Sequence, residues 1–288
     1  MKRSTLLFLS YTVAVLAIFR APLRELLELS LRNDSCSYIP FIPLLSGCIM
    51  FSRRELLARR MSPSYMTGIA AALTGGVLCL LCVLGETGPR HDGYLPLMMI
   101  SLVILLAGGF IFFYGARAFR SMLFPFLLLL LLAPVPAGIM GDIVRFLQAS
   151  SADVSYFFFK LVRIPVEREG FIFHLPGVNI EVAQQCSGIR SSTVLFIMGV
   201  FASGLFLKTG WRRTVLILSI LPIAIVKNGL RITTLSFLAI YVDKGILESS
   251  LHRKGGVVFF LIALAVFASI LKALEKSETN QRRERAGS

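Results

Sequence analysis

The chain has 288 residues, of which 56% are hydrophobic and 16% are charged. Soluble domains hold about 45–50% apolar and about 25% charged residues, so the composition excludes an ordinary soluble domain or a disordered chain. The formal net charge is +14, but the basic residues are not gathered on one soluble domain, which argues against nucleic-acid binding. The composition predicts a polytopic membrane protein, and its 23 Phe and 23 Gly residues favour helices over a barrel of strands.

Eight apolar stretches approach the length of about 20 residues that a helix needs to cross a membrane. The first follows Lys2 and Arg3 and lacks a small-residue cleavage site, so we expect an uncleaved span rather than a signal peptide. The second is short and holds Pro40 and Pro43, so a re-entrant segment is the alternative. The pattern predicts one all-α membrane domain over 1–288, with spans at 4–19, 36–52, 66–84, 95–116, 121–141, 191–207, 214–242 and 256–274.

These spans divide the domain into four parts, which are spans one to five (1–141), an external segment of 49 residues (142–190), spans six to eight (191–274) and a cytoplasmic tail (275–288). In the external segment, the apolar spacing over 143–161 predicts one or two amphipathic helices on the membrane surface. The following stretch, 166–182, predicts a short hairpin that turns at Pro176-Gly177.

Basic residues are distributed unequally between the predicted loops. One set of loops and termini carries 16 basic and four acidic residues, whereas the opposite loops carry 12 of each. Because cytoplasmic loops are enriched in Lys and Arg, we expect both termini in the cytoplasm and the protein in the cell's inner, cytoplasmic membrane. If the second span did not cross, only the N-terminus would change sides.

The five cysteines do not form a disulfide framework, and we expect no metal and no cofactor. Cys36, Cys48, Cys79 and Cys82 lie in apolar stretches, where a thiol behaves as a small hydrophobe. The C-x-x-C spacing of Cys79 and Cys82 has no His or charged neighbour to support a redox or zinc site. Cys186 differs, because it lies among polar residues directly before an apolar helix.

Three reactive side chains, Cys186, Arg231 and His252, are predicted to lie at one level of the membrane. Counted from the nearest cytoplasmic basic residue, they lie 22, 18 and 20 residues along three different spans. At the rise of an α-helix these separations are about 27–33 Å, close to the thickness of the hydrocarbon core. We therefore expect a thiol, a guanidinium and an imidazole together at the outer interface.

These three groups suit acyl transfer through a thioester. If Ser187 capped the sixth span, the helix N-terminus and the nearby Arg190 and Arg231 would favour the thiolate of Cys186, which is the nucleophile. An imidazole moves protons near neutral pH, and a guanidinium stabilises a developing oxyanion. The 29-residue stretch 214–242 exceeds one span, so we expect a break at Asn228-Gly229 that opens Arg231 to a polar pocket.

Structural interpretations stand beside these roles. A lone Cys near a helix start is usually structural, Arg231 could anchor its span at the interface, and His252 could be a solvated loop residue. His174 in the predicted hairpin and His91 in a short loop are alternative bases.

Two other functions fit parts of the sequence. A transporter of a lipid or polysaccharide precursor would use Lys227 and Arg231, which lie four residues apart on one helix face, as an anion site. No inverted repeat supports this alternative. A transferase that uses a polyprenyl phosphate would need paired carboxylates or a metal site outside, which the external acids do not provide.

The sequence resembles the exosortase/archaeosortase family of membrane transpeptidases in three ordered blocks. They are Glu181-x4-Cys186-Ser187-Gly-Ile-Arg190, then Asn228-Gly-Leu-Arg231, then His252 followed by two glycines. The resemblance covers 181–260, and the upstream spans are similar only in number and hydrophobicity.

This resemblance implies a cysteine endopeptidase and transpeptidase that cleaves C-terminal sorting signals of exported proteins and passes them to a lipid or another surface acceptor. Such a signal combines a short motif (Pro-Glu-Pro-like, as in PEP-CTERM proteins), a transmembrane helix and a basic cluster. By the resemblance, Cys186 is the nucleophile, Arg231 stabilises the oxyanion or substrate, and His252 is the acid and base. Glu181, Ser187, Arg190 and Asn228 would be supporting residues.

Overall fold

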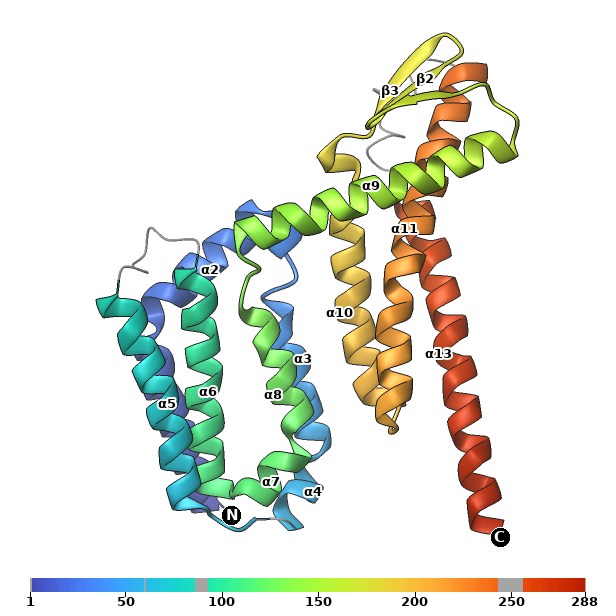
Figure 1. The fold of residues 1–288 in the computed structure, drawn as a ribbon. Coiled ribbons are helices and arrows are strands. Elements are labelled where there is room, and N and C mark those ends of the chain that lie inside the picture. The colour runs from blue at the N-terminus through green and yellow to red at the C-terminus, as the bar shows by residue number, and fades with distance from the viewer. Residues whose placement is uncertain (1, 60, 86–92, 243–255, 288) are drawn as a thin grey trace. The chain divides into compact units, whose positions relative to one another are not determined.

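The computed structural model describes residues 2–59, 61–85, 93–242 and 256–287, which form two compact units, Met1–Ile139 and Met140–Ser288. Apart from one small sheet, every regular element in these ranges is helical (Figure 1). Five stretches among the described residues are long and apolar enough to cross a membrane, or seven if each of two bent helix pairs counts as one span. The predicted all-α polytopic membrane fold is therefore confirmed, whereas the predicted number of eight spans is not.

The first unit consists of helices and two 3-10 turns, Asp34–Cys36 and Leu130–Leu132. In this unit, helices α5 and α6 have the most extensive contact, because small residues let their two backbones approach each other. A Cβ atom at Gly68 would lie 2.6 Å from the Phe112 backbone, and Ser101 Oγ donates to the Gly75 carbonyl at 2.7 Å. The helices are α1 (Lys2–Ile18), α2 (Arg20–Arg32), α3 (Phe41–Ser52), α4 (Arg54–Arg59), α5 (Tyr65–Leu84), α6 (Tyr94–Tyr114), α7 (Ala116–Ser121) and α8 (Leu123–Leu129).

Two predicted spans of this unit are shorter than expected. The second is represented by α3, with 12 residues, and the fifth by α8 and its 3-10 turn, which end at Leu132. Pro134 and Pro136 follow; proline lacks a backbone donor and restricts the residue before it, so the predicted helix over 121–141 stops here. The two short helices pack together, with Ser46 Oγ donating to the Pro125 carbonyl at 3.0 Å.

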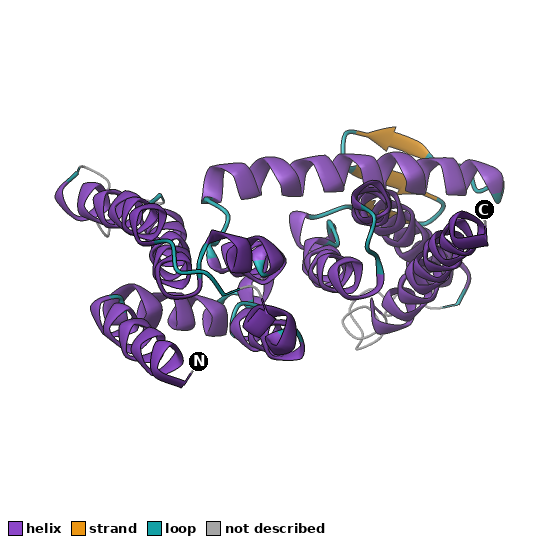
Figure 2. Cartoon of the chain, turned by 90° about the horizontal axis from the view of Figure 1, so that it is seen from below, coloured by secondary structure: helices purple, strands orange, loops and turns teal. Residues whose placement is uncertain are grey.

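In its described residues, the second unit combines four helices with a three-stranded antiparallel sheet. The sheet lies against α9 and α11 and shares with them a buried apolar cluster that includes Phe159, Phe173 and Ile232. Figure 2 shows α9 lengthwise while α10 and α11 are seen nearly end-on, so α9 lies across these helices. The elements are α9 (Ala137–Leu161), β1 (Glu167–Glu169), β2 (Ile172–Leu175), β3 (Val178–Glu181), α10 (Ile189–Phe206), α11 (Gly210–Tyr241) and α13 (Gly256–Gly287).

The predicted hairpin at Pro176-Gly177 is confirmed. Leu175 pairs with Val178 across the turn, and Gly177 has the positive φ (78°) that such a turn requires. A preceding strand, β1, extends the hairpin into a meander. The expected amphipathic helix is a single helix, α9, of 25 residues. One face of α9 is buried in the unit, and a second face exposes apolar side chains, namely Ile139, Ile143, Phe146, Phe157 and Leu161.

The predicted break in the seventh span is wrong. Helix α11 is continuous for 32 residues and passes through Asn228 and Gly229. The glycine serves close packing instead, because a Cβ atom there would lie 2.6 Å from Val154 Cγ1 of α9. Ser155 Oγ of α9 also donates to the Gly229 carbonyl at 3.3 Å. The helix therefore stays intact while α9 crosses it at this point.

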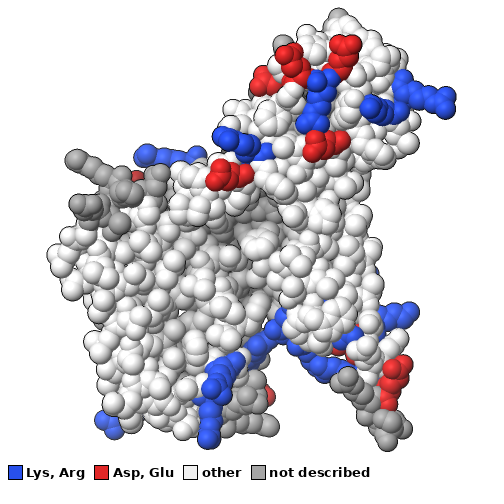
Figure 3. Space-filling model, in the orientation of Figure 1, with Lys and Arg blue, Asp and Glu red and all other residues white. Residues whose placement is uncertain are grey.

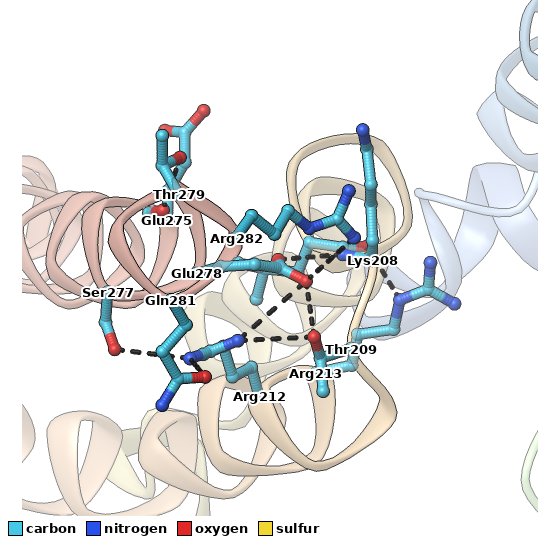
Figure 4. A network of polar contacts seen from close by, with 11 residues as sticks. Lys208, Thr209, Arg212, Arg213, Glu275, Ser277, Glu278, Thr279, Gln281 and Arg282 are labelled. Carbon is cyan, nitrogen blue, oxygen red and sulfur yellow. Dashed lines mark hydrogen bonds and ion pairs between the residues drawn. The ribbon is translucent and has the colours of Figure 1, made fainter. Parts of the chain in front are cut away.

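Charged side chains gather at the two ends of the second unit, with few between them on the face shown in Figure 3. Acids and bases are mixed over the end that carries the sheet. At the opposite end, a polar network joins the turn between α10 and α11 to α13 (Figure 4). Its centre is the ion pair of Arg212 with Glu278, whose side chains are 2% and 6% exposed.

This network, which we call the polar clasp, consists of Lys208, Thr209, Arg212, Ser277, Glu278, Gln281 and Arg282. Arg212 Nη2 donates to Gln281 Oε1 at 2.7 Å and to Ser277 Oγ at 3.3 Å. Glu278 accepts from the backbone N–H of Lys208 at 3.0 Å and from the Thr209 hydroxyl. Buried charges are stable only with such partners, so the clasp fixes the position of α13 along α11.

Candidate active site

Cys186 lies on a short link between the sheet and α10. Strand β3 ends at Glu181, and residues Gln184–Cys186 form one 3-10 turn, closed by a hydrogen bond from the Cys186 N–H to the Ala183 carbonyl at 2.8 Å. Gly188 then adopts a left-handed conformation (φ 77°), and α10 begins at Ile189. The half-buried thiol therefore lies on a tight turn just before the N-terminus of an apolar helix.

Two buried amide side chains hold this link at its ends. Gln148 of α9 donates to the Val182 carbonyl, and Asn228 of α11 donates to the Cys186 carbonyl at 2.7 Å. Gln148 is 5% exposed and Asn228 is 1% exposed. A buried carbonyl that loses its donor is costly, so each amide favours the observed backbone position. We call residues 182–186 the thiol link.

Arg231 lines the same pocket as Cys186. Asn228 and Arg231 lie three residues apart, and residues at this spacing share one face of a helix. The Asn-x-x-Arg spacing thus has a physical reason, since Asn228 holds the thiol link while Arg231 lies in the pocket beside it.

The pocket encloses about 350 Å³, its open mouth included. Its polar lining residues are Cys186, Arg231, Glu181 and Ser236, and its remaining walls are aliphatic, formed by Ile180, Val182, Ile232 and Leu235. All of them come from β3, the thiol link and α11. A thiol and a guanidinium that line one pocket with aliphatic side chains are groups that could attack a peptide carbonyl and stabilise an oxyanion on it.

The other predicted residues have different surroundings. Glu181 is exposed at the pocket, and Arg190 is exposed in the first turn of α10. Ser187 is 1% exposed, and its hydroxyl has no hydrogen-bond partner among the described residues. The predicted capping by Ser187 is therefore wrong, because the chain enters α10 through Gly188 and no side chain caps that helix.

Of the three histidines, only His174 belongs to the described residues, and His252 and His91 lie outside them. His174 lies on β2, where its Nδ1 is 3.1 Å from Asn179 Oδ1 and its Nε2 is 3.6 Å from Glu169 Oε2. It is not among the residues that line the pocket. Within the described ranges, no three His, Cys, Asp or Glu side chains are grouped as a metal site would require.

Lys227 is buried next to the site but is engaged by the helix that follows Cys186. Its ammonium donates to Ser191 Oγ, and that hydroxyl donates to the Gly188 carbonyl at 3.0 Å. The lysine thus ties the first turn of α10 to α11, and it is not among the residues that line the pocket with Arg231. The predicted anion pair of Lys227 and Arg231 is not formed around this pocket.

Gln148 is the site residue that the sequence did not reveal. It stands in a run of small and polar residues, Gln148-Ala-Ser-Ser-Ala152, near the middle of the amphipathic helix α9. This run could have predicted a close helix contact, because small residues on one helix face let another backbone approach. That face packs on α11, and it brings the amide to Val182.

The fold and this pocket together define a helical integral membrane protein with a thiol and a guanidinium at one site. A family model described as transmembrane exosortase matches residues 30–269, or 240 of the 288 residues. No significant match was found among curated proteins or solved structures. The chain belongs to the transmembrane exosortase family, which confirms the resemblance seen in its motifs.

Proposed function

We propose that this protein is a cysteine transpeptidase that cleaves the C-terminal sorting signal of exported proteins, of the PEP-CTERM kind, and transfers them to a surface acceptor. The observation that carries the proposal is the pocket that Cys186 shares with Arg231. Family membership supports the reaction class, and the basic loops support an active site on the outer face of the cytoplasmic membrane.

In the first step, the Cys186 thiolate attacks the carbonyl carbon of the scissile peptide bond, and its electron pair forms the carbon–sulfur bond. The carbonyl oxygen gains negative charge, which the Arg231 guanidinium stabilises. Collapse of this intermediate breaks the carbon–nitrogen bond, and His252 gives a proton to the departing amine. The products are a thioester on Cys186 and the released sorting-signal helix.

In the second step, a hydroxyl or amine of the acceptor attacks the thioester carbonyl. His252, now neutral, takes the proton of the attacking group, and the sulfur leaves as a thiolate. The same residues thus return to their starting states. With water as the acceptor, the product is a free carboxylate and the enzyme is a protease.

The decisive experiment is Cys186→Ala, expressed with a tagged protein that carries a sorting signal. Processing is expected to stop while the enzyme still accumulates in membranes, because the nucleophile is lost. Cys48→Ala is the matched control, since Cys48 is exposed on α3. Normal processing by Cys186→Ala would falsify the proposal. Mass spectrometry of the mature C-terminus then separates transfer, which adds a lipid or amine, from hydrolysis.

A further inference from the structure

The pocket that Cys186 and Arg231 line also has an aliphatic part. Ile180 and Val182 come from β3 and the thiol link, and Ile232 and Leu235 come from α11. Val182, Ile232 and Leu235 are 1%, 8% and 5% exposed. These four side chains, which we call the aliphatic wall, line the same pocket as Cys186 and are not used by the steps above.

The aliphatic wall is built on rigid elements. Val182 and Ile232 belong to the buried cluster that α9, the sheet and α11 form together, and Ile180 packs against this cluster. Strand β3 is held by its ladder to β2, in which Ile180 pairs with Phe173. A wall fixed on both sides is preorganised, so a ligand group that enters it does not have to order it first.

The chemistry of the wall selects the kind of group that fits. Four branched aliphatic side chains offer no hydrogen bond, so a polar or charged ligand group would lose its hydration there without compensation. An apolar group gains by removing its own surface and that of the wall from water. The pocket is open at its mouth and is lined by only eight residues, so it suits one side chain rather than a larger ligand.

We propose that the aliphatic wall is a specificity subsite that binds a branched aliphatic side chain of the substrate next to the cleaved peptide bond. The inference rests on the proposed function, because Cys186 and Arg231 place the scissile carbonyl at the polar side of the same pocket. Ile232 and Leu235 form the helix side of the subsite, and Ile180 and Val182 form its strand side.

The test uses a sorting-signal reporter in which the residue on each side of the mapped cleavage point is changed to Ala, Val, Leu, Phe or Asp. The wild-type enzyme is expected to process the Val or Leu reporter about 10-fold or more faster than the Ala and Asp reporters, because a pocket discriminates by one or a few methylene groups to this extent. Leu235→Ala enlarges the subsite and is expected to move the preference toward Phe.

Leu218→Ala is the matched control, since Leu218 lies on the same helix and is 66% exposed. It should keep the wild-type preference. An unchanged preference in Leu235→Ala, an equal change in Leu218→Ala, or fastest processing of the Asp reporter would each overturn the subsite. Absence of processing of every reporter by the wild-type enzyme would instead overturn the proposed function.

A second measurement does not depend on catalysis or on how well Leu235→Ala folds. Purified wild-type protein is treated with methanethiosulfonates that carry an ethyl, an isobutyl or a sulfonate group, and modification of the Cys186 peptide is followed by mass spectrometry. If the wall accepts aliphatic groups, the isobutyl reagent reacts faster than both others relative to a free thiol. Equal relative rates, or preference for the sulfonate, would contradict the subsite.

Discussion

Two arginines of α11, 19 residues apart, have opposite surroundings. Arg212 is 2% exposed and is enclosed by the polar clasp, where four side chains accept or balance its guanidinium. Arg231 instead lines an open pocket next to a thiol. Both charges are unusual for an apolar helix, but the first is buried in a polar network and the second lies in the wall of a pocket that a ligand can enter. An arginine within a membrane span therefore indicates function only when its surroundings are known.

The largest expected effect is on stability and comes from Arg212→Met. The substitution removes one of the two guanidinium partners of the buried Glu278 carboxylate and the donors to Ser277 and Gln281. It is expected to lower the free energy of unfolding by about 3–5 kcal/mol. Thermal unfolding in detergent measures the loss. Arg283→Met is the control, because Arg283 is exposed on the same helix as Glu278.

The double variant Arg212→Met with Glu278→Leu tests whether the clasp acts through its ion pair. Removing both charges avoids an unpaired buried group, so the double variant is expected to be more stable than Arg212→Met alone. If the two losses simply add, the clasp does not act through this ion pair.

Arg231→Lys is expected to affect processing more than stability, in contrast to Arg212→Met. Lysine keeps the charge but loses the planar pair of donors, so processing of a sorting-signal reporter should fall about 10²–10³-fold. Unfolding in detergent should change less than in Arg212→Met, because lysine keeps the positive charge and Arg231 is partly exposed, whereas Arg212 is 2% exposed. A variant that unfolds early but processes normally would reverse the assignment of the two arginines.

Gln148→Leu is expected to act on the thiol link. The leucine cannot donate to the Val182 carbonyl, so the free energy of unfolding should fall by about 1–3 kcal/mol. The rate at which maleimide modifies Cys186 should change as well, which distinguishes positioning of the thiol from stability alone. Ser150→Ala, two residues along α9, is the control, and an equal rate in both variants would show that Gln148 does not position the link.

The smallest expected effect is that of replacing two glycines, which separates the cost of a positive φ from the cost of a steric clash of the added Cβ atom. Gly188 and Gly170 both have positive φ, at 77° and 59°. A Cβ atom at Gly188 would lie 2.9 Å from Asn228 Oδ1, whereas Gly170 has nothing within 4 Å. Gly170→Ala should lower unfolding free energy by about 1–2 kcal/mol, and Gly188→Ala should lower it further and slow processing. Equal losses would mean that Asn228 moves aside without consequence.

Hydrophobicity predicted the membrane class, and turn chemistry predicted the hairpin, because both signals are local in the sequence. The lengths of α3 and α8 were not predicted, since the apolar runs continue through Pro40, which precedes α3, and through Pro134 and Pro136, which follow α8 and its 3-10 turn. The continuity of α11 was also missed. Asn228-Gly229 suits a break in isolation, but α9 fills the space above the glycine and the Cys186 carbonyl accepts a hydrogen bond from the asparagine amide.

The shared pocket of Cys186 and Arg231 agrees with the prediction that spans bring them to one level. The depth of each residue in the membrane was predicted from the rise of a helix alone, because that depth depends only on the number of residues along the span. Gln148 could not be found in this way, since its role depends on where α9 crosses the thiol link. The catalytic roles of Cys186, Arg231 and His252 stay predictions.

Because α11 is continuous, the distance and the relative orientation of Arg212 and Arg231 are fixed by the helix. Nineteen residues of helix span about 28 Å, and each added residue turns the helix by about 100° and lengthens it by about 1.5 Å. A one-residue insertion between Arg212 and Arg231 would thus turn the second arginine away from the pocket while the first stayed in the clasp. Changes in chain length within this stretch should be tolerated far less than changes in the turn at Gly170.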